Sequence, residues 1–172
     1  MMRWILERLS RLFRERIIGA RADGKPYLSR FYIFGGPRTW SSIGQNEGES
    51  YGWSWLPFNI MLHKFHMSDD DSALHNHPWK WSYSLILAGG YVEERRINNY
   101  TNVHSTFLTW RVFRPWQWNS IKADDFHRVD LIEKDCWTLF IAGPKSQSWK
   151  FWDRKTGEYV PWREFITRKR AR

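Results

Sequence analysis

Cysteine is nearly absent from this 172-residue sequence, since Cys136 is its only cysteine. A disulfide framework within the chain is therefore excluded, and a reducing compartment is indicated. No apolar run approaches the roughly 18 residues that span a membrane. The first residues, MMRWILERLSRLFRER, carry scattered charges and lack the uninterrupted apolar core of a signal peptide. We therefore expect one cytoplasmic domain with no membrane partner.

Several enzyme motifs are missing as well. The sequence contains no Walker loop, no GxSxG elbow and no GxGxxG turn. It also lacks the HxD pair that a 2-oxoglutarate oxygenase normally supplies. These absences argue against nucleotide-phosphate hydrolysis, serine hydrolase chemistry and dinucleotide binding through the usual motifs.

Acidic residues are outnumbered, with 18 Asp and Glu against 27 Lys and Arg, which gives a net charge of +9. Aromatic residues reach 18% of the chain and include 13 tryptophans. Basic charge interleaved with aromatic rings is one signature of nucleic-acid binding. The charge is spread along this chain and clusters only at its two ends, so a basic protein whose rings fill its core is favoured.

The apolar spacing predicts a helix followed by many strands. Apolar residues recur at three- and four-residue steps over residues 3–18, with arginines on the other side, which predicts a basic amphipathic helix that packs on its own domain. Strand-like segments follow at 26–34, 58–66, 82–87, 91–97, 107–113, 126–132, 137–142 and 148–152, and a short helix is expected at 162–169. Many short strands at regular spacing predict an all-β barrel or sandwich.

The expected organisation is therefore a helical region, a barrel and a tail. The N-terminal helix would occupy residues 1–20, a single β-barrel domain residues 21–167 and a basic tail residues 168–172. A homodimer is one further expectation, for which the apolar stripe of residues 4–17 is the hint.

Three of the six histidines form the most informative pattern. His75 and His77 are two residues apart, so on a strand both imidazoles would project from one face. His127 begins a later predicted strand, and the gap lets a returning strand of a small barrel place it opposite the pair. Three protein nitrogens with open coordination positions are typical of a catalytic metal site. The alternative is a barrel in which these histidines are hydrogen-bonded core residues.

The string LHNHPW…SLILAGGY…HRV…WTLFIAGP resembles the metal-binding pattern of the cupin superfamily. It is similar to a group of small cupin-like proteins from bacteria and their phages, over roughly residues 26–165. The resemblance implies a cupin-type double-stranded β-helix, also called a jelly-roll barrel, with a metal site inside its open mouth. The usual pattern has a glutamate ligand where this sequence has Ser82, whereas Gly89 fits the glycine position.

A cupin site with three histidines and no carboxylate is similar to that of the thiol (cysteine) dioxygenases. The resemblance therefore implies Fe(II) held by His75, His77 and His127, with Zn, Ni or Mn as other metals of interest. It implies O₂ activation toward a small-molecule substrate.

Three further residues are candidates for contact with that substrate. Arg128 lies beside the third histidine, and either Arg128 or Arg114 could pair with a substrate carboxylate. His63 is the third candidate, although a hydrogen-bonded core histidine is the simpler interpretation.

Carboxylates near the histidines in the sequence could orient a ligand imidazole or bind the metal directly. The run Asp69–Asp71 lacks the spacing of a calcium loop, so a turn is expected there, with one carboxylate orienting a ligand imidazole. Glu93 or Glu94 could replace the missing carboxylate ligand, but both lie past the Gly89–Gly90 turn.

Three functions remain open from the sequence. The first is a non-haem Fe(II) oxygenase, and the second is a non-catalytic cupin that binds a nucleotide, a sugar or nucleic acid through a Trp-rich basic surface. The third is a metal-dependent isomerase or hydrolase. Trp79 and Trp81 directly follow the histidine pair, and if they line a pocket they favour a flat or apolar substrate. Packing alone explains them equally well.

Overall fold

A computed structural model describes residues 1–20, 26–35, 57–69, 73–98, 106–154 and 156–170. The elements, in chain order, are α1 (Met2–Ser10), β1 (Arg14–Ala20), β2 (Pro26–Phe34), β3 (Asn59–Phe65), β4 (Leu74–His75), β5 (Trp81–Ala88), β6 (Tyr91–Asn98), β7 (Thr106–Phe113), β8 (Trp118–Lys122), β9 (His127–Leu131), β10 (Cys136–Ala142), β11 (Lys150–Trp152), β12 (Tyr159–Pro161) and α2 (Trp162–Arg170).

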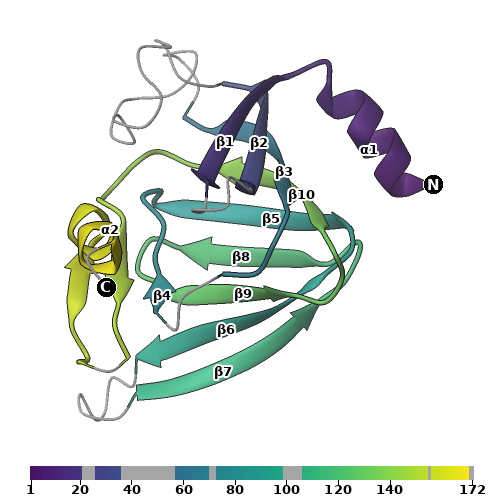
Figure 1. Ribbon diagram of the computed structural model, residues 1–172. Coiled ribbons are helices and arrows are strands. Elements are labelled where there is room, and N and C mark those ends of the chain that lie inside the picture. Colours follow the sequence, from purple (N-terminus) through teal and green to yellow (C-terminus); the bar gives the residue numbers. More distant parts are fainter. Residues whose placement is uncertain (21–25, 36–56, 70–72, 99–105, 155, 171–172) are drawn as a thin grey trace.

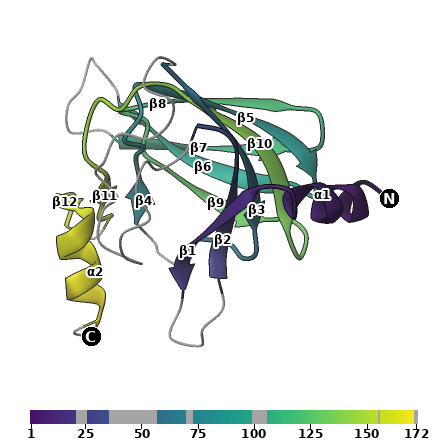
Figure 2. The ribbon, with the colours of Figure 1, turned by 90° about the horizontal axis from the view of Figure 1, so that it is seen from above.

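The strands form two six-stranded sheets with antiparallel pairing, in the orders β1-β2-β3-β10-β5-β8 and β12-β11-β4-β9-β6-β7. The all-β jelly-roll expected from the sequence is confirmed. Helix α1 lies at one end of the molecule, and β11, β12 and α2 lie at the other (Figures 1 and 2).

Strand β10 occupies an inner position of the first sheet, and its composition suits that place. Cys136, Trp137 and Thr138 are fully buried, and Trp137 packs in a cluster with Phe31 and Leu62. The neighbouring strand β5 instead alternates buried and more exposed side chains, as a strand with one face toward the core does.

A turn between β5 and β6 carries the chain from the first sheet to the second. Gly89 has a φ of 76°, and a Cβ added there would lie 2.2 Å from the carbonyl oxygen of Asp135. Only glycine fits this backbone without strain. The turn sets the start of β6 and hence the position of Glu93.

The N-terminal helix is present but much shorter than predicted. The expectation of a helix over residues 3–18 is wrong beyond Ser10, because residues 14–20 form β1 and pair along β2. The segment RERIIGA contains adjacent β-branched residues, which suit a strand, and pairing with β2 supplies the backbone hydrogen bonds. The β-structure therefore begins at Arg14, and not at residue 21.

Other predicted boundaries also shift. Strands β8 and β12 are additions to the sequence prediction, and β4 is limited to Leu74 and His75. Helix α2 continues to Arg170, so it takes in part of the expected basic tail at 168–172. Residues 171–172, Asp70, Asp71 and His104 lie outside the described residues. Among the residues described, no helix has both the length and the apolar character needed to cross a membrane.

Candidate metal centre

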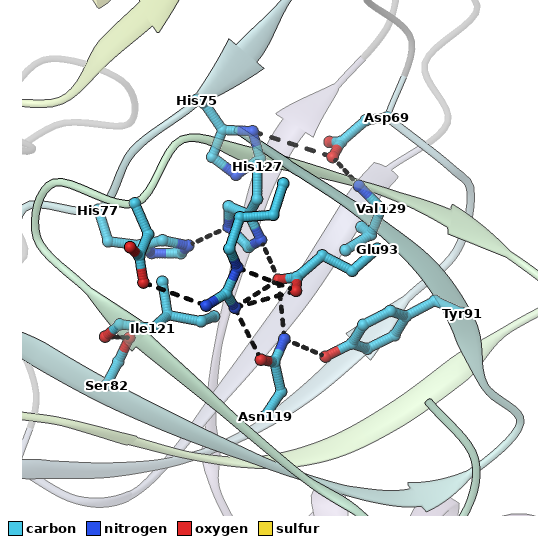
Figure 3. A network of polar contacts seen from close by, with 12 residues as sticks. Asp69, His75, His77, Ser82, Tyr91, Glu93, Asn119, Ile121, His127 and Val129 are labelled. Carbon is cyan, nitrogen blue, oxygen red and sulfur yellow. Dashed lines mark hydrogen bonds and ion pairs between the residues drawn. The ribbon is translucent and has the colours of Figure 1, made fainter. Parts of the chain in front are cut away.

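The three histidines singled out by the sequence meet at one point in the barrel (Figure 3). His75 and His127 are directly opposite each other in the pairing of β4 with β9. The His127 ring centroid lies 4.9 Å from that of His75 and 4.9 Å from that of His77. The ring centroids of His75 and His77 are 5.5 Å apart. One ligand nitrogen from each residue lies within 4.8 Å of the other two.

The expectation that one strand carries both His75 and His77 is wrong, because β4 ends at His75. Asn76 holds the segment beyond the strand: its side-chain oxygen accepts a hydrogen bond from the backbone N of Lys150 at 2.8 Å. Gln147 also donates to the backbone carbonyl of His77 at 3.0 Å. The hydrogen bonds of Asn76 and Gln147 therefore fix the irregular segment that carries His77 after the end of β4.

A buried carboxylate fixes the orientation of His127. Glu93 Oε1 lies 2.6 Å from His127 Nδ1, and Glu93 is only 2% exposed. An ionised carboxylate only accepts hydrogen bonds, so Nδ1 carries the proton and the lone pair of Nε2 points toward the other histidines. His77 Nε2 is 2.8 Å from His127 Nε2. With the proton of His127 on Nδ1, this contact is a hydrogen bond that His77 Nε2 donates to His127 Nε2.

Glu93 is held in turn by two further side chains. Arg95 donates to both carboxylate oxygens, at 3.1 and 3.0 Å, and Asn119 donates to Oε1 at 2.8 Å. Burial raises the pKa of Glu93, but the hydrogen bond from His127 and the charges of His127 and Arg95 outweigh burial and lower this pKa to about 2. The carboxylate is therefore ionised and available as an acceptor.

The other two histidines are held neutral by their surroundings. Burial lowers the pKa of His75 to about 4, against the opposing charge of Asp69. Burial also lowers the pKa of His77 well below its ordinary value, with His127 and His75 acting in the same direction. Neutral imidazole is the form that binds a metal.

Asp69 only partly meets the expectation of a carboxylate that orients an imidazole. Its Oδ2 lies 3.9 Å from His75 Nδ1, too far for a hydrogen bond, and accepts one from the backbone N of Val129 at 2.7 Å. The stronger support for the cluster comes from Glu93, which the sequence analysis considered only as a metal ligand.

Ser82 and Glu94, the other two positions considered for a carboxylate ligand, have partners other than the three histidines. Ser82, in the glutamate slot, is fully buried, and its Oγ donates to the carbonyl of Ile121 at 3.4 Å. Glu94 pairs with Arg154 and with Arg128. The cluster of three histidines therefore has no carboxylate among the residues that form it.

A cavity of about 380 Å³ opens beside the histidines. Aromatic residues form much of its wall: Tyr27, Phe65, Trp79, Tyr91, Phe140, Trp149 and Trp162. Arg128 and Arg114 do not line this cavity. Arg128 follows His127 on β9 and is bound to Asp130 at 2.5 Å, whereas Arg114 is exposed past the end of β7. Neighbouring positions on a strand face opposite ways, which explains why Arg128 turns away from the site.

His63 does line the cavity, together with a residue that the sequence analysis missed. The Nε of Arg30 donates to His63 Nε2 at 3.0 Å, and the His63 ring stacks on Phe140 at a centroid distance of 4.6 Å. Burial, followed by the charge of Arg30, lowers the pKa of His63 well below its ordinary value. A signal for Arg30 existed, because Leu28, Arg30 and Tyr32 share one face of the predicted strand 26–34.

The single cysteine has no part in the site. Cys136 is fully buried in β10, and burial raises the pKa of its thiol to about 12. Such a thiol is inert at neutral pH.

Comparisons with known proteins agree on the fold. No protein-family model matches the chain, and no curated protein matches it either. Among solved structures, oxalate decarboxylase from Lactobacillus farciminis in a formate complex matches 92% of this chain and 36% of its own, with 9% identity and a TM-score of 0.51. A recombinant oxalate oxidase bound to glycolate matches 80% of this chain and 62% of its own, with 14% identity and a TM-score of 0.49. The Fe(II) form of HppE with the alternative substrate (S)-1-HPP matches 75% of this chain and 56% of its own, with 8% identity and a TM-score of 0.45.

The likeness to the oxalate decarboxylase structure supports the cupin-type jelly-roll fold of this chain, which also has the N-terminal helix α1. The chain spans 56% of the HppE chain, 62% of the oxalate oxidase chain and 36% of the oxalate decarboxylase chain. At such identities the likeness concerns the fold alone.

Proposed function

We propose that this protein is a metal-dependent cupin, in which His75, His77 and His127 hold Fe(II) for the oxygenation of a small molecule. The observation that carries the proposal is the convergence of three imidazoles, with Glu93 bound to Nδ1 of His127 so that its Nε2 points into the cluster. The similarity to thiol dioxygenases seen in the sequence makes small thiols the first substrates to test.

The hydrogen bonding of His75 supports a metal role over a purely structural one. A buried core histidine is normally satisfied by hydrogen bonds. Among the described residues, the nearest charged partner of the His75 ring is Asp69 at 3.9 Å, beyond hydrogen-bonding distance, although His75 is only 8% exposed. The ring of His75 is therefore not fixed by a hydrogen bond to Asp69, and it is available to a metal ion.

The number of ligands and the adjoining cavity favour catalysis. Structural zinc sites usually close all four positions with protein ligands, whereas three ligands leave positions open. Here the open side faces a cavity of about 380 Å³. Fe(II) would supply the redox chemistry that activates O₂, and the protein's part is to orient the imidazoles, exclude bulk water and position the substrate.

Anaerobic titration with Fe(II), followed by oxygen-uptake assays with small thiols and other metabolites, tests the proposal. Wild-type protein should bind one iron, and His127→Ala should not. His66→Ala is the matched control, because His66 bonds to Ser29 Oγ at 2.9 Å and lies outside the cluster. Tight binding of zinc or nickel, with no oxygen uptake, would favour an isomerase or hydrolase. Failure to bind any of these metals would overturn the proposal and favour a non-catalytic binding module.

A further inference from the structure

We infer that the cavity beside the histidines takes a small organic anion with a flat apolar body, and that Arg30 binds its anionic group. This inference names the substrate class of the proposed function, and so rests on it for any chemistry. The anion-binding step itself depends on Arg30 and the cavity wall, and can be measured without a metal.

Among the described residues, the charged side chains that line the cavity are basic. Its cationic side chains are Arg16, Arg30, Lys145 and Arg163, and no aspartate or glutamate is among the described residues that line it. The nearby carboxylate of Glu93 lies behind His127 and is paired with Arg95. A concave site lined by one sign of charge concentrates ligands of the opposite sign.

Arg30 has the chemistry to receive an anion. Its side chain is half-buried, its Nε donates to His63, and its guanidinium carbon lies 5.4 Å from the centroid of the Trp79 ring. In the part of the chain that the structure describes, no acidic side chain forms an ion pair with Arg30. A guanidinium has five N–H donors, so with Nε engaged both terminal nitrogens can still bind a carboxylate or phosphate as a fork.

His63 fixes the direction of that fork. Arginine can only donate, so His63 Nε2 must be the acceptor, and the imidazole is neutral with its proton on Nδ1. The His63 ring is itself held against Phe140 with an interplanar angle of 19°. The guanidinium therefore stands on a pre-ordered support, which reduces the entropy lost when an anion binds.

Aromatic side chains connect Arg30 with the histidine cluster. The Trp79 ring stacks with His77 at a centroid distance of 5.8 Å and 26°, and it contacts Phe140 at 5.5 Å. Arg30 contacts the same Trp79 ring. A planar molecule lying along this wall would place its anionic end at Arg30 and its other end toward the three histidines.

Calorimetric titration of the chelator-treated, metal-free protein with benzoate and with neutral benzamide tests the inference. We expect benzoate to bind about tenfold more tightly than benzamide, and Arg30→Gln to abolish that preference. Arg8→Gln removes the same charge from the exposed face of α1 and should leave the preference unchanged. Phenyl phosphate in a parallel titration distinguishes a phosphate substrate from a carboxylate, according to which anion binds more tightly.

Equal binding of benzoate and benzamide, an unchanged preference in Arg30→Gln, or no binding of either anion would overturn the inference. Circular dichroism melting checks that Arg30→Gln is folded. If it is not, Arg30→Lys serves instead, since it keeps the charge and loses the fork, and the preference should fall without vanishing. Because the protein is metal-free here, a failure of this test is separate from a failure of the iron titration.

Discussion

A carboxylate from another strand accepts the hydrogen bond of His127 Nδ1 and so fixes the tautomer and orientation of this imidazole. Glu93 lies on β6, and the register of β6 against β9 places Arg95 opposite His127. The carboxylate of Glu93 thus accepts hydrogen bonds from both His127 and Arg95. Removing its charge should release the imidazole and leave a buried guanidinium without its partner.

Glu93→Gln should therefore weaken metal binding by about 10- to 100-fold, because the amide can donate to Nδ1 and favour the wrong tautomer. Competition titration with Co(II), followed by its visible absorption, measures this loss. Glu94→Gln is the neighbouring control, since Glu94 pairs with Arg154 and Arg128. Equal affinities of the two variants would show that Glu93 does not orient the ligand.

His75 makes folding stability depend on pH. In the folded metal-free protein its pKa is lowered to about 4 by burial, from an ordinary value of 6.5. Between these values the unfolded chain binds more protons than the folded one, so folding stability falls as the pH falls. His75 alone contributes on the order of 3 kcal/mol to this loss.

Urea unfolding of the chelated protein, from about pH 7 down to about pH 4.5, measures that slope. His75→Asn should reduce the slope without abolishing it, since asparagine does not titrate but burial also lowers the pKa values of His63 and His77. A wild-type stability independent of pH over this window would contradict the buried neutral state of His75.

At the scale of elements, the sequence predicts best where periodicity and chain breaks agree. Strand β2 occupies the predicted residues 26–34, and β6 differs from its prediction by a single residue at its C-terminal end. The prediction of a helix over residues 11–18 was wrong because the apolar positions there also fit helical spacing. Only the pairing of β1 with β2 selects the strand. The role of Glu93 could not be predicted either, since it depends on the register between β6 and β9.

Helix α1 contributes to stability through its inner face. Leu6 is 5% exposed and packs in the cluster that contains Phe31, Leu62, Ala88 and Trp137. Leu6→Ala should lower the free energy of unfolding by about 2–4 kcal/mol, because it leaves a cavity in this cluster. Leu9→Ala, on the exposed side of the same helix, should cost less than about 1 kcal/mol. Chemical denaturation compares the two, and equal losses would mean that the helix does not dock as described.

At the scale of the whole molecule, the site unites distant parts of the chain. His77 and His127 are 50 residues apart in sequence, and the histidines connect β9 with β4 and the segment that follows it. The sequence could locate this cluster because its histidines have the spacing on which the resemblance to cupins rests. It could not specify the cavity wall, where Arg30 from β2 meets His63 from β3 and Trp79 from beyond β4.

A metal that binds only the folded state stabilises the whole protein by mass action. At about 100 times the dissociation constant the gain is about 2.7 kcal/mol, which for a chain of this size raises Tm by about 5–10 °C. Differential scanning calorimetry with and without added metal measures this shift. It should vanish in His127→Ala, and a shift of equal size in that variant would place the metal elsewhere.

The most direct measurement is the metal content of untagged protein purified without chelator, determined by inductively coupled plasma mass spectrometry. Wild-type protein should contain close to one iron per chain, and His75→Ala and His127→Ala should contain almost none while remaining folded. Iron retained in both variants would contradict the three-histidine site. The absence of metal from wild-type protein, together with no uptake of Fe(II) added anaerobically, would contradict the metal-dependent function itself.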